Sequence, residues 1–378
     1  MDCISVGKDR LGGIKQMKIS TQRLKDATNK AIKGAGFNNL IPLTSMIGLK
    51  LSDGALKLST TDMTNTLTVI IDKVAGEDLS VTVDADKFGK LISKITSEDV
   101  DLSLVDDNLV IKANGTYKLP LISDEEGLVE FPLVEVKPTH GEVMLTSIMS
   151  AYNINKSALA KTMEQPSLTG YYCGEKVITT DALVITFNDF KMFNNNNGDE
   201  PLLISSQMMQ LLTLNDKEKI EFSVNGSELQ FVTDNVIVSG AMLEGIEDYP
   251  VEAISQYLDE AFESSCKVPK GLLLDVLDRL ALFIEPYDKN GAYFTFGRKG
   301  INIHSKKDAS TEVIHYVASE NFNPFVCCVD IPVFREQLQA IPEDTVQLFY
   351  GNENALKIVC GKVTQVIALL EDEELDNE

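Results

Sequence analysis

The sequence predicts an α+β protein made of three tandem modules, each with two helices packed on antiparallel strands. The first observation is an internal repeat: the same order of strand, helix-like stretch, charged turn and further strand begins at Val81, Leu202 and Val326. These starting points are 121 and 124 residues apart, a spacing that is hard to obtain by chance. The second observation is an alternation of apolar and polar residues, which indicates strands with one buried face.

Six helix-like stretches supply two helices to each module. They are residues 21–33, 84–95, 146–161, 205–213, 269–284 and 331–340. The fifth gives the clearest signal, because Leu273, Leu277 and Leu280 recur at helical spacing. Asp62 and Asp181 stand at equivalent places in two repeats, where a strand ends, so we interpret both as turn or capping residues.

Prolines and polar residues mark the boundaries between the modules. We predict an N-terminal extension at 1–16, modules at 17–136, 137–260 and 261–370, and an acidic tail at 371–378. The tail is almost entirely acidic, so we expect it to be disordered.

Composition and motifs exclude several classes of protein. No run of about 18 apolar residues could span a bilayer and no signal-peptide pattern opens the chain, so we expect a cytoplasmic protein without a membrane partner. The six cysteines form no CxxC pair, and the three histidines have no neighbouring ligand at zinc spacing, so we predict reduced thiols and no metal site. The sequence has no P-loop, GxSxG or HExxH motif, which argues against an enzyme and against a cofactor.

Short motifs inside the repeat resemble the beta subunit of bacterial DNA polymerase III, over residues 17–370. They are Leu58–Asp62, Leu168–Gly170, Thr180–Asp181 and Glu244–Pro250. The resemblance implies a sliding clamp, a processivity factor without catalytic residues. Two chains would close head to tail into a ring of six modules that encircles double-stranded DNA without sequence specificity. The implied partners are the replicative DNA polymerase, a clamp loader and a second copy of the chain.

The distribution of charge tests this interpretation. The net charge of -23 is unfavourable for phosphate binding unless positive residues are segregated. With the first stretch counted from Lys15, the six helix-like stretches together carry +8, which leaves -31 for the rest of the chain. We therefore predict that basic helices line the pore. The candidate residues are Arg23, Lys25, Lys30, Lys33, Lys87, Lys90, Lys156 and Lys161.

The resemblance also implies a cleft that receives a short apolar peptide from partner proteins. Carried over by position, its residues are Leu168, Thr180, Ala182, Leu183, Val184, Val366, Ala368 and Leu370. Apolar candidates for the dimer interface are Tyr117, Leu282 and Phe283. Plain core packing is an equally good interpretation of Val184 and Val366.

Two points stay open on the sequence alone. The family usually ends in a short Met-Pro-Met-Arg-Leu type tail, whereas this chain continues for eight residues beyond Leu370, which makes a phage-encoded version plausible. The positive charge is modest and lies mainly in the first module. A clamp-like protein-interaction scaffold that does not encircle DNA is therefore the alternative function.

Overall fold

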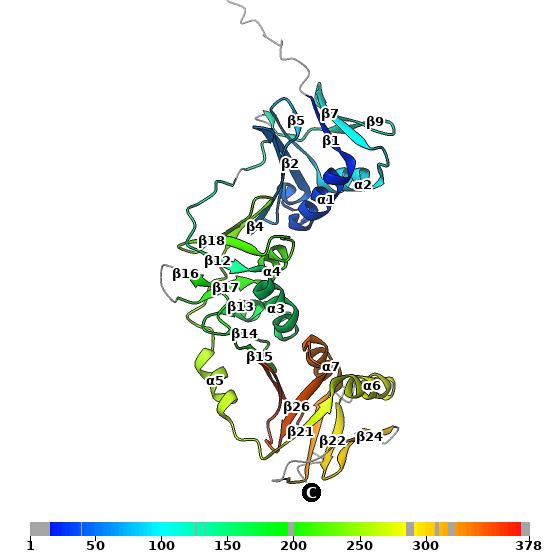
Figure 1. Ribbon diagram of the computed structural model, residues 1–378, viewed down its shortest axis with the longest axis vertical. Coiled ribbons are helices and arrows are strands. Elements are labelled where there is room, and N and C mark those ends of the chain that lie inside the picture. Colours follow the sequence, from blue (N-terminus) through cyan, green and yellow to red (C-terminus); the bar gives the residue numbers. More distant parts are fainter. Residues whose placement is uncertain are drawn as a thin grey trace, which may run out of the picture. The chain divides into compact units, whose positions relative to one another are not determined.

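The computed structural model describes residues 16–38, 40–124, 127–132, 134–195, 200–284, 291–306, 310–316 and 322–371. The chain divides into two compact units. Their helices and strands are labelled in Figure 1. The first unit comprises 1–142 and 210–241, and the second comprises 143–209 and 242–378. Most of the predicted N-terminal extension and of the acidic tail lies outside the described residues. The predicted module boundaries differ from the borders of these units and stay a prediction.

The first unit contains two helices and three groups of antiparallel strands. Its elements are β1 (Gln16–Ser20), α1 (Thr21–Ala31), η1 (Ile32–Gly34), η2 (Pro42–Ser45), β2 (Met46–Ser52), β3 (Ala55–Thr61), β4 (Asn65–Ile71), β5 (Ala75–Gly76), β6 (Leu79–Asp84), α2 (Ala85–Lys94), β7 (Asp99–Val105), β8 (Asn108–Lys112), β9 (Thr116–Pro120), β10 (Ser123–Asp124), β11 (Gly127–Leu128), β18 (Lys219–Asn225), β19 (Glu228–Val232) and β20 (Val236–Ala241). One sheet has the order β5-β1-β7-β8-β9, and another contains the run β18-β19-β20-β4-β3-β2-β6. Two further elements, β12 (Gly141–Met144) and α4 (Ser206–Leu212), straddle the border between the units.

The helices of the first unit pack closely on each other because their contact carries a glycine. Phe88 and Ile92 of α2 are fully buried, as is Leu24 of α1. A Cβ atom at Gly89 would lie 1.9 Å from Cδ1 of Ile32, so a larger residue there would force the Ile32 side chain to move. Burying a side chain such as Leu24, Phe88 or Ile92 stabilises the fold by about 1.5–3 kcal/mol.

The second unit contains α-helices, 3-10 turns and antiparallel strands. They are α3 (Leu145–Asn155), η3 (Lys156–Ala158), η4 (Pro166–Thr169), β13 (Gly170–Cys173), β14 (Val177–Thr180), β15 (Val184–Asn188), β16 (Asn194–Asn195), β17 (Leu202–Ser205), α5 (Val251–Asp259), β21 (Ser264–Pro269), α6 (Lys270–Leu280), η5 (Ala281–Phe283), β22 (Gly291–Gly297), β23 (Gly300–Ser305), β24 (Thr311–His315), β25 (Phe325–Asp330), α7 (Ile331–Ala340), β26 (Thr345–Tyr350), β27 (Ala355–Cys360) and β28 (Val363–Ala368). Its sheets have the orders β17-β13-β14-β15-β28-β27-β26-β21 and β24-β23-β22-β25.

The internal repeat is visible in the caps and turns. Asp84 and Asp330 accept a hydrogen bond from the backbone N–H three residues on and cap α2 and α7, at 2.7 and 2.9 Å. Asp62 accepts from the backbone of Asn65 at 2.6 Å, and Asp181 accepts from the backbone of Val184 at 2.8 Å. The prediction that Asp62 and Asp181 are turn residues is therefore confirmed.

Strands from neighbouring modules pair in both units. In the first unit β4 pairs with β20, with Asn65 opposite Gly240. In the second unit β15 pairs with β28, with Val184 opposite Ile367. Since Asn65 and Val184 follow equivalent turns, the two pairings have the same register.

The helix prediction needs two corrections. The stretch 146–161 is too long, because α3 ends at Asn155 and a 3-10 turn follows. The buried Asn155 amide donates to the carbonyl oxygens of Val177 and Thr186 at 3.3 and 3.2 Å, which fixes the end of the helix against the sheet. The helix α5 was not predicted at all and lies in the acidic segment taken as a boundary.

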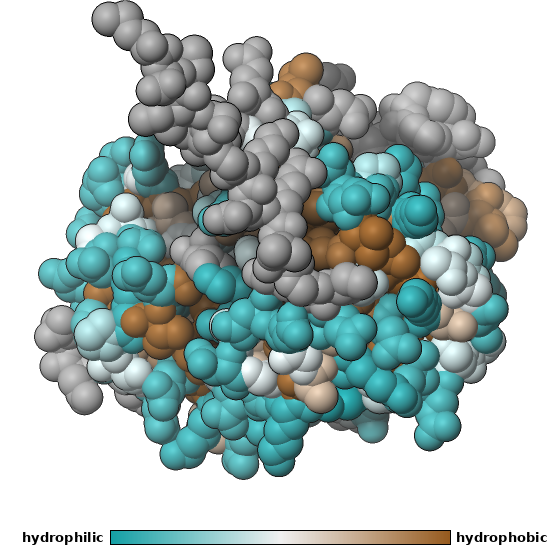
Figure 2. Space-filling model, turned by 90° about the horizontal axis from the view of Figure 1, so that it is seen from above, coloured by the Kyte–Doolittle hydropathy of each residue, from teal (hydrophilic) through white to brown (hydrophobic). Residues whose placement is uncertain are grey.

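Other features bear on the excluded classes. No helix in the described ranges is long and apolar enough to cross a bilayer. Those ranges also hold no group of three or more His, Cys, Asp or Glu placed to bind a metal ion. The five described cysteines are free and buried, and burial raises the pKa of Cys266 to about 12. The face shown in Figure 2 is mostly hydrophilic, with hydrophobic residues in separate patches.

Candidate functional site

The predicted pore residues of the first unit lie on the outer faces of its two helices. Within the bounds of the structure, α1 has three basic residues and one acid, and α2 has three basic residues and one acid. Leu24, Ala27 and Ala31 bury the opposite face of α1. Lys33 follows on η1 and is exposed. Each helix therefore presents a net charge of +2 toward solvent.

Several of these cations already have partners. Lys90 forms an ion pair with Asp86 at 2.7 Å, one turn away on α2. The guanidinium of Arg23 donates to the backbone carbonyl of Asp72. Lys25 and Lys87 form no ion pair with any described residue. Of the predicted pore residues in the first unit, these two are therefore available to an external anion.

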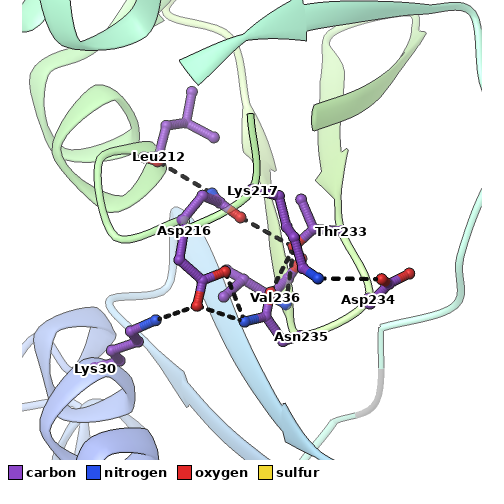
Figure 3. A network of polar contacts seen from close by, with 9 residues as sticks. Lys30, Leu212, Asp216, Lys217, Thr233, Asp234, Asn235 and Val236 are labelled. Atoms are coloured by element: carbon purple, nitrogen blue, oxygen red, sulfur yellow. Dashed lines mark hydrogen bonds and ion pairs between the residues drawn. The ribbon is translucent and has the colours of Figure 1, made fainter. Parts of the chain in front are cut away.

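Lys30 belongs to a polar network that connects α1 to the loop after α4 (Figure 3). Its ammonium lies 3.4 Å from the carboxylate of Asp216. The side-chain amide of Asn235 donates to both oxygens of that carboxylate, at 2.9 and 3.0 Å. Partial burial opposes ionisation of Asp216, but the donors from Asn235 and Lys30 outweigh it and lower the pKa.

The basic residues predicted in the second unit do not lie on a regular helix. Lys156 begins η3, and its ammonium sits 5.0 Å from the ring centre of Tyr152. Lys161 lies beyond η3 and is 3.4 Å from the carboxylate of Glu336 on α7. The helix α3 itself has no charged residue. The positive excess is therefore concentrated in the first unit.

An apolar pocket of about 370 Å³ lies in the second unit, beside the paired strands β15 and β28. It brings together six of the eight predicted cleft residues: Leu168, Thr180, Ala182, Leu183, Val366 and Ala368. Leu183 is 64% exposed at its edge, whereas Leu168 is buried in its floor. Such a site suits an apolar peptide anchor. A larger pocket of about 520 Å³ at the start of α3 is lined mainly by polar residues and contains none of the predicted ones.

Two predicted cleft residues do not line the pocket. Val184 is fully buried and packs into the hydrophobic core around α6 and α7. Leu370 donates its backbone N–H to the carbonyl of Cys328 at 2.9 Å. A Cβ atom at Gly291 would lie 3.0 Å from the Leu370 side chain, so Leu370 packs near β22 and β25.

One wall of the pocket comes from α5, which the sequence interpretation missed. Pro250, Ala253, Ile254 and Tyr257 line it and fall on one helical face. The helical spacing of these residues after Pro250 is the sequence signal that could have predicted α5. The remaining lining residues are Gln165, Ile185, Asn354 and Ala355.

The predicted interface residues are exposed apolar side chains. Tyr117 lies on β9, an edge strand of its sheet, and is 37% exposed. Leu282 and Phe283 lie on η5 and are 80% and 49% exposed. In the four-stranded sheet of the second unit, β24 is one of the two edge strands.

Comparisons with known proteins agree with this architecture. Residues 15–133 match the family described as DNA polymerase III beta subunit, N-terminal domain. No curated protein sequence matches the chain. The solved DNA polymerase sliding clamp from Bacillus subtilis is 15% identical, with a TM-score of 0.84, over 95% of this chain and 100% of that one. This chain has the sliding-clamp fold.

Two further structures with the sliding-clamp fold give the same result. The DNA polymerase III beta subunit from Thermotoga maritima is 15% identical, with a TM-score of 0.83, over 95% of this chain and 100% of that one. A putative beta subunit from Eubacterium rectale is 18% identical, with a TM-score of 0.82 and the same coverage. The predicted α+β class and the predicted resemblance are therefore confirmed at the level of the fold.

The Lys30 network gives a testable difference between two acidic residues. Asp216→Ala should lower the midpoint of thermal unfolding by about 2–4 °C at pH 7, corresponding to about 1 kcal/mol, because Asn235 and Lys30 lose their acceptor. The matched control is Asp234→Ala. The Asp234 side chain is 84% exposed and its ion pair with Lys217 is long, at 3.5 Å, so this substitution should lower the midpoint by much less.

The pH dependence of this effect follows from the direction of the pKa shift. The pKa of Asp216 in the folded protein is below its usual value of 3.8. Its stabilising contribution is therefore complete above about pH 4 and is lost as the pH falls further. Scanning calorimetry of both variants from pH 7 to pH 3 measures this. If Asp216→Ala still lowered the midpoint of thermal unfolding by the same amount at pH 3, the stabilising role of the ionised Asp216 carboxylate would be contradicted.

Proposed function

We propose that this protein is a DNA sliding clamp: two copies close head to tail around double-stranded DNA and tether the replicative polymerase to it. The full-length likeness of the fold at TM-scores above 0.8 is the observation that carries this proposal. In this proposal the three predicted modules are the repeating elements of the ring, and a clamp loader opens it. The role is one of binding, in the cytoplasm of a bacterium or, for a viral gene, of its host.

The register of the two junctions supports a specific mode of ring closure. Leu67 on β4 lies opposite Val238 on β20, and Thr186 on β15 lies opposite Gln365 on β28. In the same repeat, β24 corresponds to β4 and β15, and β9 corresponds to β20 and β28. Within one chain β24 and β9 each lie at the edge of a sheet and do not pair with each other. Ring closure then pairs β24 of one chain with β9 of the other. Ser310 of one chain comes opposite Tyr117 of the other.

The helix ends extend this equivalence to apolar contacts. Ser157 follows α3 and donates to Gln337 of α7 at 2.9 Å. Leu282 is the equivalent of Ser157 after α6, and Leu91 is the equivalent of Gln337 on α2. Closure therefore places Leu282 and the neighbouring Phe283 against the partner's Leu91. An apolar contact replaces the polar one found inside the chain.

A cysteine pair tests the closure. A chain carrying Tyr117→Cys and Ser310→Cys should form a covalent dimer on mild oxidation, because side chains directly opposite in an antiparallel pair have Cβ atoms about 4.5–5.5 Å apart. The control pairs Tyr117→Cys with Thr311→Cys, whose side chain points to the other face of the sheet. Non-reducing electrophoresis and light scattering measure the product. A monomer at micromolar concentration, or equal cross-linking of both pairs, would refute this closure.

The pore proposal predicts a loss of DNA retention on charge reversal. A variant with Glu at positions 23, 25, 30 and 33 should leave nicked circular DNA at least about 10-fold faster, because a basic lining holds phosphates without reading bases. The control reverses four exposed lysines outside the helices: Lys112, Lys267, Lys299 and Lys362. Both variants change the net charge equally.

Gel filtration of preloaded clamp on DNA measures retention. Cutting the circle should release the wild-type protein from the DNA ends. Equal binding to circular and linear DNA would instead favour the alternative function, a scaffold that does not encircle DNA.

The pocket proposal predicts a loss of polymerase binding. Leu183→Asp should weaken binding of the terminal peptide of the cognate polymerase at least about 10-fold, because a buried apolar anchor would meet a charge. Leu183 is the better probe than Leu168, whose burial couples it to the fold. Fluorescence anisotropy with a labelled peptide measures the affinity, and Leu272→Asp, at an exposed leucine of α6, is the control. Unchanged affinity would move the site elsewhere.

A further inference from the structure

The pocket beside β15 and β28 is apolar, but acidic residues adjoin its lining residues in three loops. Glu164 precedes the lining residue Gln165, and Glu353 precedes the lining residue Asn354. Asp181 stands between two lining residues, Thr180 and Ala182. None of the residues that line the pocket, nor their immediate neighbours in the sequence, is a lysine or an arginine. One lysine does come close in space: Lys357 pairs opposite the lining residue Val366, and its ammonium donates to the carbonyl of Leu258 at 3.1 Å. The three acids beside the lining residues therefore outnumber this lysine, whose ammonium is already engaged.

Asp181 is fixed in place with one oxygen left for an external donor. Its Oδ1 accepts from the backbone N–H groups of Leu183 and Val184, at 3.0 and 2.8 Å. At the equivalent turn of the first module, Asn65 donates its amide to the second oxygen of Asp62 at 3.1 Å. Val184 occupies the place of Asn65 and has no such donor. Among the described residues, Oδ2 of Asp181 has no hydrogen-bond partner.

The acids of α5 do not contribute to this edge. Ala253, Ile254 and Tyr257 face the pocket, so Glu252 lies on the opposite side of the helix. The helix instead presents Tyr257, which is 40% exposed and lines the pocket. A tyrosine ring of this kind attracts a cation placed over its face.

We propose that the pocket selects peptides whose apolar anchor residues are flanked by lysine or arginine. This inference rests on the proposed function of the pocket and specifies the chemistry of the partner. Leu183, Leu168 and Val366 receive the apolar anchors, and the carboxylates of Asp181, Glu353 and Glu164 receive the flanking cations. The net charge of -23 attracts such peptides and repels acidic ones at low ionic strength.

A random decapeptide display library selected on the full-length protein tests this proposal. A Leu183→Ser/Tyr257→Ser variant, which loses the apolar wall without a change of charge, serves for counter-selection and removes peptides attracted by net charge alone. The selected peptides are expected to contain at least two large apolar residues and more Lys and Arg than Asp and Glu. Selected peptides that are neutral or acidic would overturn the proposal. If no peptide survives counter-selection, the pocket is not a peptide site, and the proposed function of the pocket fails instead.

A second measurement assigns the preference to the three carboxylates. Asp181→Asn retains an oxygen for the backbone donors, and it is combined with Glu164→Gln and Glu353→Gln. Each lost charge pair should weaken a selected basic peptide by a factor of about 2 to 5, so the loss of all three pairs is about 8- to 125-fold and shrinks at 0.5 M salt. The control neutralises three exposed acids of the other unit: Asp107, Glu130 and Glu218. An equal loss in the control would reject the assignment.

Discussion

Strand pairing between modules is the constraint on which the rest of the structure depends. Within the first unit β20 extends the sheet of β4, and within the second unit β28 extends the sheet of β15. The backbone hydrogen bonds of these pairs fix the register, because a slip by one residue would turn every buried side chain to the wrong face. The same register brings a helix end of one module to the next module in both places, where Lys30 meets Asp216 and Ser157 meets Gln337.

The two junctions use different chemistry for the same geometry. At the first, the Lys30 and Asp216 side chains are 31% and 55% exposed, so salt and acid weaken their contact. At the second, Gln337 is buried and accepts from Ser157 at 2.9 Å and from Gln365 at 3.2 Å. Its own amide donates to the backbone of Ser157 at 2.9 Å. A buried network of this kind holds one arrangement, because each broken hydrogen bond leaves an unsatisfied polar group. The second junction is therefore the more rigid of the two.

The sequence was sufficient for features that repeat and insufficient for features that occur once. Even spacing and alternation predicted the α+β modules, and the matching positions of Asp62 and Asp181 predicted their turns. Six of the fourteen residues that line the pocket followed from the family resemblance, and the other eight did not. The helix α5 was missed because it is short and stands between two acidic segments, Glu244–Asp248 and Asp259–Glu263. The place of Leu370 depends on a backbone hydrogen bond to Cys328, a contact across 42 positions that no local pattern reports.

The turn at Asp181 belongs to both the pocket and the junction. Thr180 donates its hydroxyl to the carbonyl of Val184 at 2.7 Å, and Ala182 adopts a positive φ of 76° between them. This conformation is strained for a residue with a side chain, and the hydrogen bonds of Asp181 and Thr180 hold it in place. It turns Leu183 outward to the pocket while Val184 points inward and pairs with Ile367. Peptide recognition and the joining of modules thus depend on adjacent residues of one turn. Substitutions at Leu183 separate the two roles, whereas substitutions at Val184 disturb both.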